Sequence, residues 1–213
     1  MASYAIPAAL FDSPLRRRGG WQLLEGWASP EICRALRAEA EAMYARAERT
    51  DSTAPDREEV RGGDPPRAFT SAVAGERQEA LYQSQELRQR LEQEGGAPLR
   101  PSALRGTYTY YEQPGDHLAV HRDIQGCDIT VVTCLRDEAD PTSDRGAVCL
   151  WPGHLEGALS ELRMAPDLGA VRVRLAVGET LLLLGGFLPH AVQPVAPGQD
   201  LLRSILCYQL ETD

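Results

Sequence analysis

The stretch YYEQPGDHLAVHRDIQGCDITVVTCL, residues 110–135, places metal-binding side chains at the end of an alternating apolar run. His121 and Asp123 are two residues apart, so on a strand they point to the same face of a sheet. An imidazole and a carboxylate together are typical ligands of divalent transition metals. The motif alone is weak, because a strand that ends in a polar turn gives the same pattern. The rest of the chain must decide between these interpretations.

A second histidine and an arginine follow in two later apolar segments. The run GETLLLLGGFLPH delivers His190 after a pair of glycines, and Arg203 lies within the strand-like run LLRSILCYQL. A buried guanidinium group is costly unless it meets an anion. The chain therefore offers two imidazoles, one carboxylate and one buried guanidinium, all expected on strands of one sheet system.

The order of these residues resembles the Fe(II)/2-oxoglutarate-dependent dioxygenases, and most of all their prolyl-4-hydroxylase-like branch. That family has a His-x-Asp motif, then a distal histidine, then an arginine, in the order of His121, Asp123, His190 and Arg203. The segments YEQPGDHLAVHRD, GAVCLWPG and HAVQPV are similar to segments of that branch. The resemblance covers residues 105–210, roughly half of the chain.

The resemblance implies a non-haem Fe(II) ion held by His121, Asp123 and His190, with 2-oxoglutarate and O2 as cosubstrates and ascorbate as a candidate reductant. Two histidines and one carboxylate on one face of an iron ion leave the other face open. The implied reaction converts 2-oxoglutarate to succinate and CO2 and hydroxylates, or otherwise oxidises, an unactivated C–H bond. The sequence does not separate hydroxylation from desaturation, cyclisation or epimerisation.

The same resemblance assigns residues to 2-oxoglutarate. Arg203 suits the distal carboxylate, because a guanidinium group can hold a carboxylate through two hydrogen bonds. Relatives that use lysine here are excluded as a guide, since the chain has no lysine. Tyr111 stands where the family has a tyrosine that helps to hold the cosubstrate, although an aromatic core residue is the alternative. Thr133 is a further candidate contact, and Ser204 should face away because it adjoins Arg203.

Three residues are candidates for substrate binding: Arg67, Arg105 and Thr109. By strand parity, Thr109, Thr107 and Arg105 share the face of Tyr111 and can line the same cavity. Arg67 ends the polar, Pro- and Gly-rich segment 49–67, which predicts a long loop of the kind that forms a lid or is disordered. The two arginines would suit a carboxylate or another anion.

The other histidines and Arg122 are interpreted as structural. His117 could share the metal-binding face by parity alone, but PGDH favours a turn, with the strand beginning after it. His154, in WPGHLEG, indicates a surface turn. Arg122 should point away from the metal-binding face, into solvent rather than at the mouth of the cavity.

Rival functions fit the sequence less well. HRD also opens the catalytic loop of protein kinases, but Asp128 stands where that loop has asparagine, and no lysine can bind phosphates. Nucleic-acid demethylases of the same superfamily typically have a second arginine where this chain has Gln209. Halogenases of the superfamily lack the carboxylate ligand that Asp123 supplies. A non-catalytic metal-binding β-barrel protein is the alternative from a different class.

The composition is that of a soluble globular protein, and 213 residues most simply form one domain. The formal net charge of −9 argues against nucleic acid as the main partner. No apolar run is long enough to span a membrane, and the N-terminal segment lacks a secretory pattern. The 5 scattered cysteines, none with CxxC spacing, predict reduced thiols in a cytoplasmic protein. The sequence does not indicate an oligomeric state.

The secondary-structure signals indicate a mainly β (α+β) chain. Ser29 and Pro30 begin a helix with apolar residues as far as Met43, and ERQEALYQSQELRQRLEQEGG predicts a second helix with a stop at Gly95. About seven strand-like runs follow. We expect residues 1–100 to be mostly helical support and loop, and residues 101–213 to form a double-stranded β-helix (jelly roll, cupin-like) with the N-terminal helices packed outside.

A small molecule, such as an amino acid or a natural-product intermediate, is the favoured substrate. The compact chain, and basic residues that are all arginine, as in a GC-rich genome, favour bacterial specialised metabolism. The alternative is a residue of a protein, as with prolyl or peptidyl hydroxylases.

Overall fold

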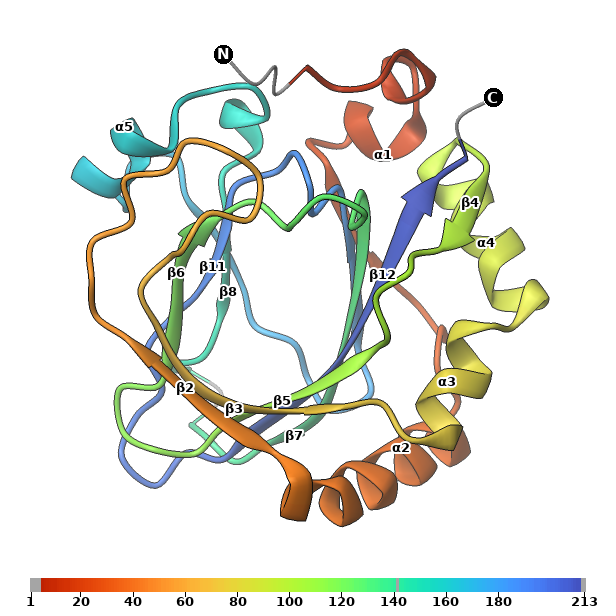
Figure 1. Cartoon of the computed structure of the whole chain (residues 1–213), viewed down its shortest axis with the longest axis vertical. Coiled ribbons are helices and arrows are strands. Elements are labelled where there is room, and N and C mark those ends of the chain that lie inside the picture. The colour runs from red at the N-terminus through yellow and green to blue at the C-terminus, as the bar shows by residue number, and fades with distance from the viewer. Residues whose placement is uncertain (1–4, 141, 212–213) are drawn as a thin grey trace.

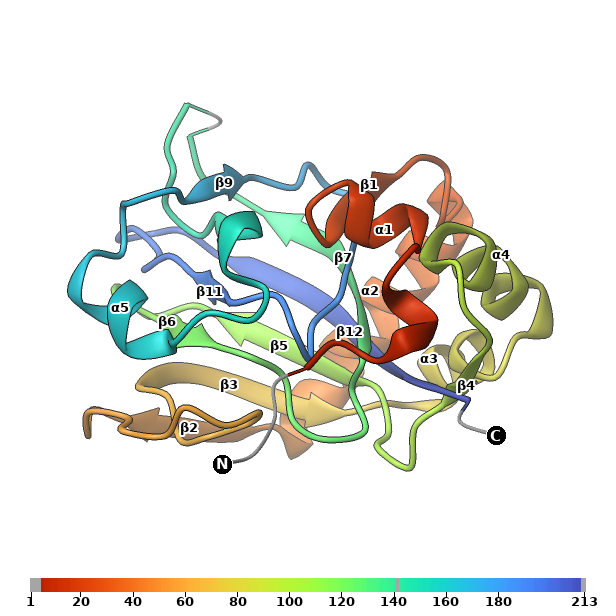
Figure 2. The ribbon, with the colours of Figure 1, turned by 90° about the horizontal axis from the view of Figure 1, so that it is seen from above.

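The computed structural model describes residues 5–140 and 142–211, in which 12 strands join in one antiparallel sheet. Neighbouring strands follow the order β1-β10-β7-β12-β5-β3-β6-β11-β8-β9, with β2 paired to β3 and β4 to β12. The sheet curls around a central space (Figure 1), and its two layers face each other when seen from above (Figure 2). The predicted jelly-roll core is confirmed. The strands are β1 (Trp21–Leu24), β2 (Glu48–Ser52), β3 (Arg67–Val73), β4 (Leu99–Pro101), β5 (Thr107–Tyr111), β6 (His117–His121), β7 (Ile129–Asp137), β8 (Val148–Leu150), β9 (Val171–Val173), β10 (Thr180–Leu183), β11 (His190–Val192) and β12 (Leu201–Leu210).

Helices pack outside the sheet, and three of them, α2, α3 and α4, lie together beside β5, β7 and β4 (Figure 1). Within the described part of the chain, no helix is long and apolar enough to cross a membrane. The α-helices are α1 (Pro14–Arg17), α2 (Pro30–Met43), α3 (Glu76–Tyr82), α4 (Gln85–Gly95) and α5 (Leu159–Met164); the 3-10 turns are Ala8–Leu10, Tyr44–Arg46 and Pro152–His154.

The first predicted helix is confirmed as α2. The Ser29 hydroxyl accepts a hydrogen bond from the Ile32 amide at 3.2 Å, as an N-cap does. Leu36 and Ala40 are buried against the sheet, and the Tyr110 hydroxyl donates to the Ala40 carbonyl at 2.7 Å. Because side chains alternate along β5, this contact turns Tyr110 outward and leaves Tyr111 on the inner face.

The second predicted helix is wrong as one continuous element. The structure breaks it into α3 and α4, and the Ser84 hydroxyl accepts a hydrogen bond from the Leu87 amide at 3.4 Å. Serine competes for backbone hydrogen bonds and so favours a cap over a helix interior. Helix α4 ends at the predicted stop, Gly95, and its C-cap is Gly96, whose φ of 76° is left-handed and suits glycine.

Residues 1–100 are expected to be mostly helices and loop, and the structure adds strands there that the sequence analysis did not anticipate. Four strands, β1 to β4, come from this region, and β3 lies between β5 and β6 in the sheet. The predicted loop 49–67 begins within β2 and reaches the first residue of β3, so its irregular part is residues 53–66. These strands are short or polar, which hid their alternation in the sequence. That residues 1–213 form one domain stays a prediction.

Two of the cysteines form a disulfide bond, so the prediction of five reduced thiols is wrong. Cys127 precedes β7 and Cys207 lies on β12, with a Cα–Cα distance of 4.9 Å. The remaining cysteines, Cys33, Cys134 and Cys149, are free. The two partners are 80 residues apart, and only the pairing of β7 with β12 brings them together.

Thiol titration in denaturant without reductant should therefore find three reactive thiols, and five after reduction. Replacing Cys207 with serine should lower the free energy of unfolding by about 2–4 kcal/mol, because the cross-link no longer restricts the unfolded chain. Cys33→Ser is the matched control and should change stability little. Five thiols in the untreated protein would contradict the disulfide.

Candidate metal centre

Strands β6 and β11 bring two imidazoles together. His121 and His190 are directly opposite each other in the antiparallel register, and their ring centroids are 4.2 Å apart. Asp123 lies two residues beyond His121, and its Oδ1 is 3.5 Å from His121 Nε2 and 3.6 Å from His190 Nε2. One ligand atom from each residue lies within 4.8 Å of the others. The three predicted metal ligands therefore converge, and His121, Asp123 and His190 are called the metal-binding set below.

Both imidazoles are oriented by backbone carbonyl groups. His121 Nδ1 lies 3.0 Å from the Ala119 carbonyl oxygen, and His190 Nδ1 lies 2.9 Å from that of Leu188. A carbonyl oxygen only accepts, so each Nδ1 must carry the proton. In the neutral imidazole each Nε2 then has a lone pair directed at the other ligands, which is the arrangement that a metal ion requires. Only a protonated imidazole can donate from Nε2 to the Asp123 carboxylate.

Asp123 is held in place through both its carboxylate and its backbone. The Thr130 hydroxyl donates to Oδ2, and the Asp123 amide donates to the Gly185 carbonyl at 2.8 Å. Gly185 leaves room for this carboxylate, because a Cβ atom there would clash with Asp123 Oδ2 and Thr130 Oγ1. The glycine that accompanies the distal histidine is therefore a steric requirement of the carboxylate ligand.

Electrostatics keep Asp123 ionised. Burial alone would raise the pKa of Asp123, but attraction to His190 and hydrogen bonds from both imidazoles hold that pKa well below its usual range. Burial, together with the nearby His190, lowers the pKa of His121. Burial also acts to lower the pKa of His190, but the Asp123 carboxylate outweighs it, so the pKa of His190 is raised. An ionised carboxylate between two imidazoles is a ready donor set for a divalent cation.

An inner cavity of about 280 Å³ extends from these ligands to Arg203. Arg203 is 2% exposed and pairs with Thr109 on β5 across the sheet. One of its nitrogens donates to the Gly146 carbonyl. In the described part of the chain, neither Arg203 Nε nor Thr109 Oγ1 has a hydrogen-bond partner. Two buried, unsatisfied polar atoms beside a metal-binding set fit the carboxylate of a cosubstrate such as 2-oxoglutarate.

Tyr111 also lines the inner cavity, and the Arg203 guanidinium carbon lies 5.9 Å from its ring centroid. Burial raises the pKa of Tyr111 to about 12, against the weaker opposing effect of Arg203. The phenol is therefore neutral at pH 7 and can donate a hydrogen bond into the cavity. This position is the one expected for a cosubstrate contact.

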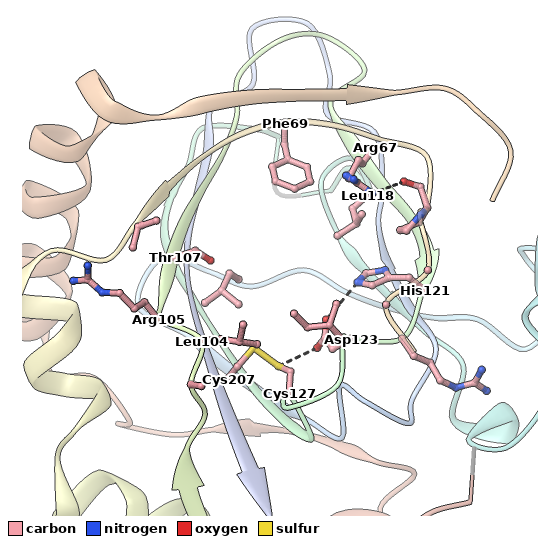
Figure 3. Close-up of a pocket in the computed structure, with 18 residues that line it drawn as sticks. Arg67, Phe69, Leu104, Arg105, Thr107, Leu118, His121, Asp123, Cys127 and Cys207 are labelled. Atoms are coloured by element: carbon pink, nitrogen blue, oxygen red, sulfur yellow. Dashed lines mark hydrogen bonds and ion pairs between the residues drawn. A yellow bond between two sulfur atoms is a disulfide. The ribbon is translucent and has the colours of Figure 1, made fainter. Parts of the chain in front are cut away.

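An outer cavity of about 670 Å³ adjoins the inner one. His121 and Asp123 line both cavities, whereas His190 lines only the inner one. Arg67 and Arg105 both line the outer cavity, on opposite sides of it (Figure 3). The metal-binding set thus lies at the junction of an inner and an outer space.

Comparison with known proteins agrees with this arrangement. No protein-family model and no curated protein matches the chain. SnoN, a non-heme alpha-ketoglutarate-dependent epimerase from nogalamycin biosynthesis, superimposes with a TM-score of 0.72 over 97% of this chain and 83% of SnoN, at 19% identity. This chain has the fold of the Fe(II)/2-oxoglutarate-dependent oxygenases. Identities this low establish the shared fold alone.

Two further structures have the same fold. HygX of Streptomyces hygroscopicus, solved with nickel and 2-oxoglutarate bound, gives a TM-score of 0.67 over 97% of this chain and 88% of HygX, at 15% identity. A prolyl-4-hydroxylase of Pseudomonas putida gives 0.59 over 91% of this chain and 94% of its own, at 19% identity. Similarity therefore extends to enzymes of the branch that the sequence resembles.

Of the three residues predicted to contact the cosubstrate, two line the inner cavity and one does not. Arg203 and Tyr111 line the inner cavity as predicted, but Thr133 does not. Its hydroxyl is hydrogen-bonded to that of Thr180 at 2.9 Å, on the face of β7 opposite Thr130. The prediction for Thr133 is wrong, because the sequence alone does not show which residues of β7 face the cavity. Ser204 faces away as predicted, and Gln78 donates to its hydroxyl at 2.7 Å.

The candidate substrate residues divide between the two cavities. Thr109 lines only the inner cavity, where it lies with Arg203 and Tyr111 rather than with Arg67 and Arg105. Arg105 is largely exposed and lies 3.7 Å from Glu79, whereas Arg67 is 2.8 Å from Asp64. Contact of the two arginines with substrate stays a prediction.

Arg122 is not in solvent, and that prediction is wrong. Its side chain is 0% exposed, and its Nε donates to the Phe187 carbonyl at 2.8 Å. Nη2 donates to the carbonyls of His154 at 3.0 Å and Gly157 at 2.6 Å. Arg122 therefore fixes the turn around His154 and the segment before His190 against the end of β6.

His117 begins β6 but does not join the metal-binding set. Opposite β11, the register shifts between His121 and Leu118, so the strand carries a bulge. A bulge interrupts the alternation of side chains. Leu118, rather than His117, consequently shares the cavity with His121 (Figure 3).

Sequence analysis missed Arg61, which holds the loop that follows the metal-binding strand. Arg61 donates four hydrogen bonds to this loop, and its guanidinium carbon lies 4.9 Å from the Phe187 ring centroid. Its acceptors are the carbonyls of Asp123 (3.2 Å), Ile124 (2.9 Å) and Cys127 (2.7 Å) and the carboxylate of Asp128 (2.7 Å). A polar loop gave no sequence signal for such a role.

Replacing Gly185 with alanine should weaken binding of a divalent metal ion about tenfold or more. The φ of Gly185 is not in the left-handed region, so the effect is steric: the new methyl group displaces the Asp123 carboxylate. Titration with Co(II) followed by its absorption spectrum measures the affinity. Gly153→Ala is the control, since a Cβ atom there meets nothing within 4 Å. Equal affinities in the two variants would contradict this role.

Replacing Arg61 with methionine should lower metal affinity by roughly tenfold and also lower the melting temperature, because the loop behind Asp123 loses its donors. Arg61→Lys keeps the charge but not the four-bond geometry, so it should restore only part of the affinity. Arg57→Met, on an exposed residue of the same segment, is the matched control. A loss of stability with unchanged metal affinity would limit Arg61 to a structural role.

Proposed function

We propose that the protein is an Fe(II)- and 2-oxoglutarate-dependent oxygenase that oxidises an unactivated C–H bond and releases succinate and CO2. The observation that carries this proposal is the convergence of His121, Asp123 and His190 at the wall of a cavity that ends at Arg203. Structures with the same fold contain Fe3+ and alpha-ketoglutarate in SnoN, and nickel and 2-oxoglutarate in HygX.

Each residue of the site has a separate proposed role. His121, Asp123 and His190 would hold Fe(II), which supplies activation of O2 when it is bound. The Arg203 guanidinium would hold the distal carboxylate of 2-oxoglutarate through its unpartnered Nε. Tyr111 donates from a phenol that burial keeps neutral, and the apolar walls of the cavity exclude water around these groups.

A small molecule is the proposed substrate. The outer cavity of about 670 Å³ has the size of a pocket for a small organic molecule. Oxygenases with this fold also include prolyl hydroxylases, one of them solved with a peptide fragment, so oxidation of a protein residue is the second candidate. A cytoplasmic location remains part of the proposal.

The test is formation of succinate from 2-oxoglutarate by protein loaded with Fe(II), with ascorbate present. Asp123→Ala and His190→Ala should each lower turnover at least about a hundredfold, because each removes a metal ligand. Arg203→Leu should raise the KM for 2-oxoglutarate about a hundredfold, the expected cost of an unpaired carboxylate. Wild-type turnover in either ligand variant would contradict the assignment.

Ser204→Ala is the matched control for Arg203→Leu. Ser204 adjoins Arg203 on β12 but hydrogen-bonds with Gln78 on the other face of the sheet. The KM for 2-oxoglutarate should therefore stay within about twofold of wild type. Metal binding without succinate formation under any condition would favour the non-catalytic metal-binding protein.

A further inference from the structure

The outer cavity has features that restrict the chemistry of the substrate, and this inference rests on the proposed function. Asp123 and His121 line the outer cavity, so a molecule in it lies against the metal-binding set. Arg203 and Tyr111 line only the inner cavity, which assigns that space to the cosubstrate. The outer cavity is then the place where a substrate would meet the reacting centre.

The wall of the outer cavity is mainly apolar. It is formed by side chains from β3, β6, β12, the segment before β5 and the loop after β6, together with the disulfide bond (Figure 3). The apolar side chains are Pro65, Phe69, Val73, Ala103, Leu104, Leu118, Ile124 and Ile205. Such a wall favours a bulky apolar body, because binding removes apolar surface from water on both sides.

Charged side chains in this wall are almost all cationic. Apart from Asp123, which belongs to the metal-binding set, no acidic residue is among those that line the cavity. Arg67, Arg105 and the buried Arg122 line it. Arg67 and Arg105 each have a partner outside it, Asp64 and Glu79 respectively. An ammonium group in this cavity would lose water without gaining a counter-charge, which is costly.

Part of this wall belongs to segment 53–66, which is fastened at two points. Arg61 holds it to the loop behind Asp123. On the other side, Arg163 of α5 pairs with Asp56 at 3.0 Å and with Glu59 at 3.2 Å. The side of the cavity that includes Gly62 and Pro65 is therefore preformed, rather than assembled by a free loop.

We propose that the substrate is a bulky, largely apolar small molecule that is neutral or anionic, and not a zwitterionic amino acid. Its apolar body lies against Phe69, Leu104 and Ile205, within reach of the metal-binding set. An anionic group, where present, lies on the side of Arg67, which is 28% exposed and can exchange Asp64 for a ligand.

Three probes with the same two-ring body test this: naphthylethanol, naphthylacetate and naphthylethylammonium. Calorimetry measures their dissociation constants with protein loaded with Ni(II) and 2-oxoglutarate. The neutral and anionic probes should bind at least about tenfold more tightly than the cationic probe, and free leucine should not bind measurably. Equal or tighter binding of the cationic probe, or no binding of any probe, would overturn the proposal.

Leu104→Glu places a negative charge, which the wall otherwise lacks, in the outer cavity. Leu104 suits this test because it lines the outer cavity and not the inner one. This variant should weaken naphthylacetate and strengthen naphthylethylammonium, each about tenfold, whereas damage to the fold would weaken all three probes alike. Ala103→Trp, at an exposed rim position, should weaken all three by filling space while the melting temperature is kept. Val177→Glu, on an exposed residue that does not line either cavity, should change nothing.

Succinate formation without any probe separates the two levels of the proposal. If 2-oxoglutarate is turned over in an Arg203-dependent way but the probes bind in another order, only the substrate inference fails. If no 2-oxoglutarate is turned over, the proposed function fails, whatever the probes do. Unchanged probe binding in both Leu104→Glu and Ala103→Trp would place the probes elsewhere and overturn the assignment of the outer cavity.

Discussion

The antiparallel pairing of β6 with β11 holds the two imidazoles of the metal-binding set opposite each other. Asp123 reaches the same point because its amide donates to the Gly185 carbonyl, in the segment that leads to His190. All three ligands therefore depend on contact between two segments: β6 with the residues that follow it, and β11 with the residues that precede it. Arg122, between His121 and Asp123, reinforces them by bonding to the carbonyl of Phe187. A shift of this pairing would separate all three ligands at once.

The alternation of side chains on β5 and β12 separates the cavity from the helical layer. On β12, Arg203 and Ile205 face inward and Ser204 faces Gln78 of α3. A slip of one residue would place the guanidinium group under the helices and a small hydroxyl in the cavity. The hydrogen bonds that fasten α2 and α3 to the outer faces of these strands thus also fix which side chains enter the inner cavity.

The connections around the cavity are more firmly held than their composition indicates. Segment 53–66 is polar and irregular, yet Arg61 and Arg163 fasten it at two points. The disulfide bond between Cys127 and Cys207 joins the loop beyond Asp123 to β12, at the wall of the same cavity. These contacts give the outer cavity a defined wall, which is a condition for selecting substrates by shape and charge.

The metal ligands and Arg203 could be predicted from the sequence because their chemistry is rare within apolar strands, and a resemblance to one family gave them roles. The β-rich second half was also visible, since its strands alternate or are continuously apolar. The tertiary structure alone decided which face Thr133 takes, where the bulge turns His117 away, and which cysteines meet. It also placed Arg61, whose acceptors are mostly backbone carbonyls. Such contacts depend on register and on pairing between distant segments, and no local pattern of side chains encodes them.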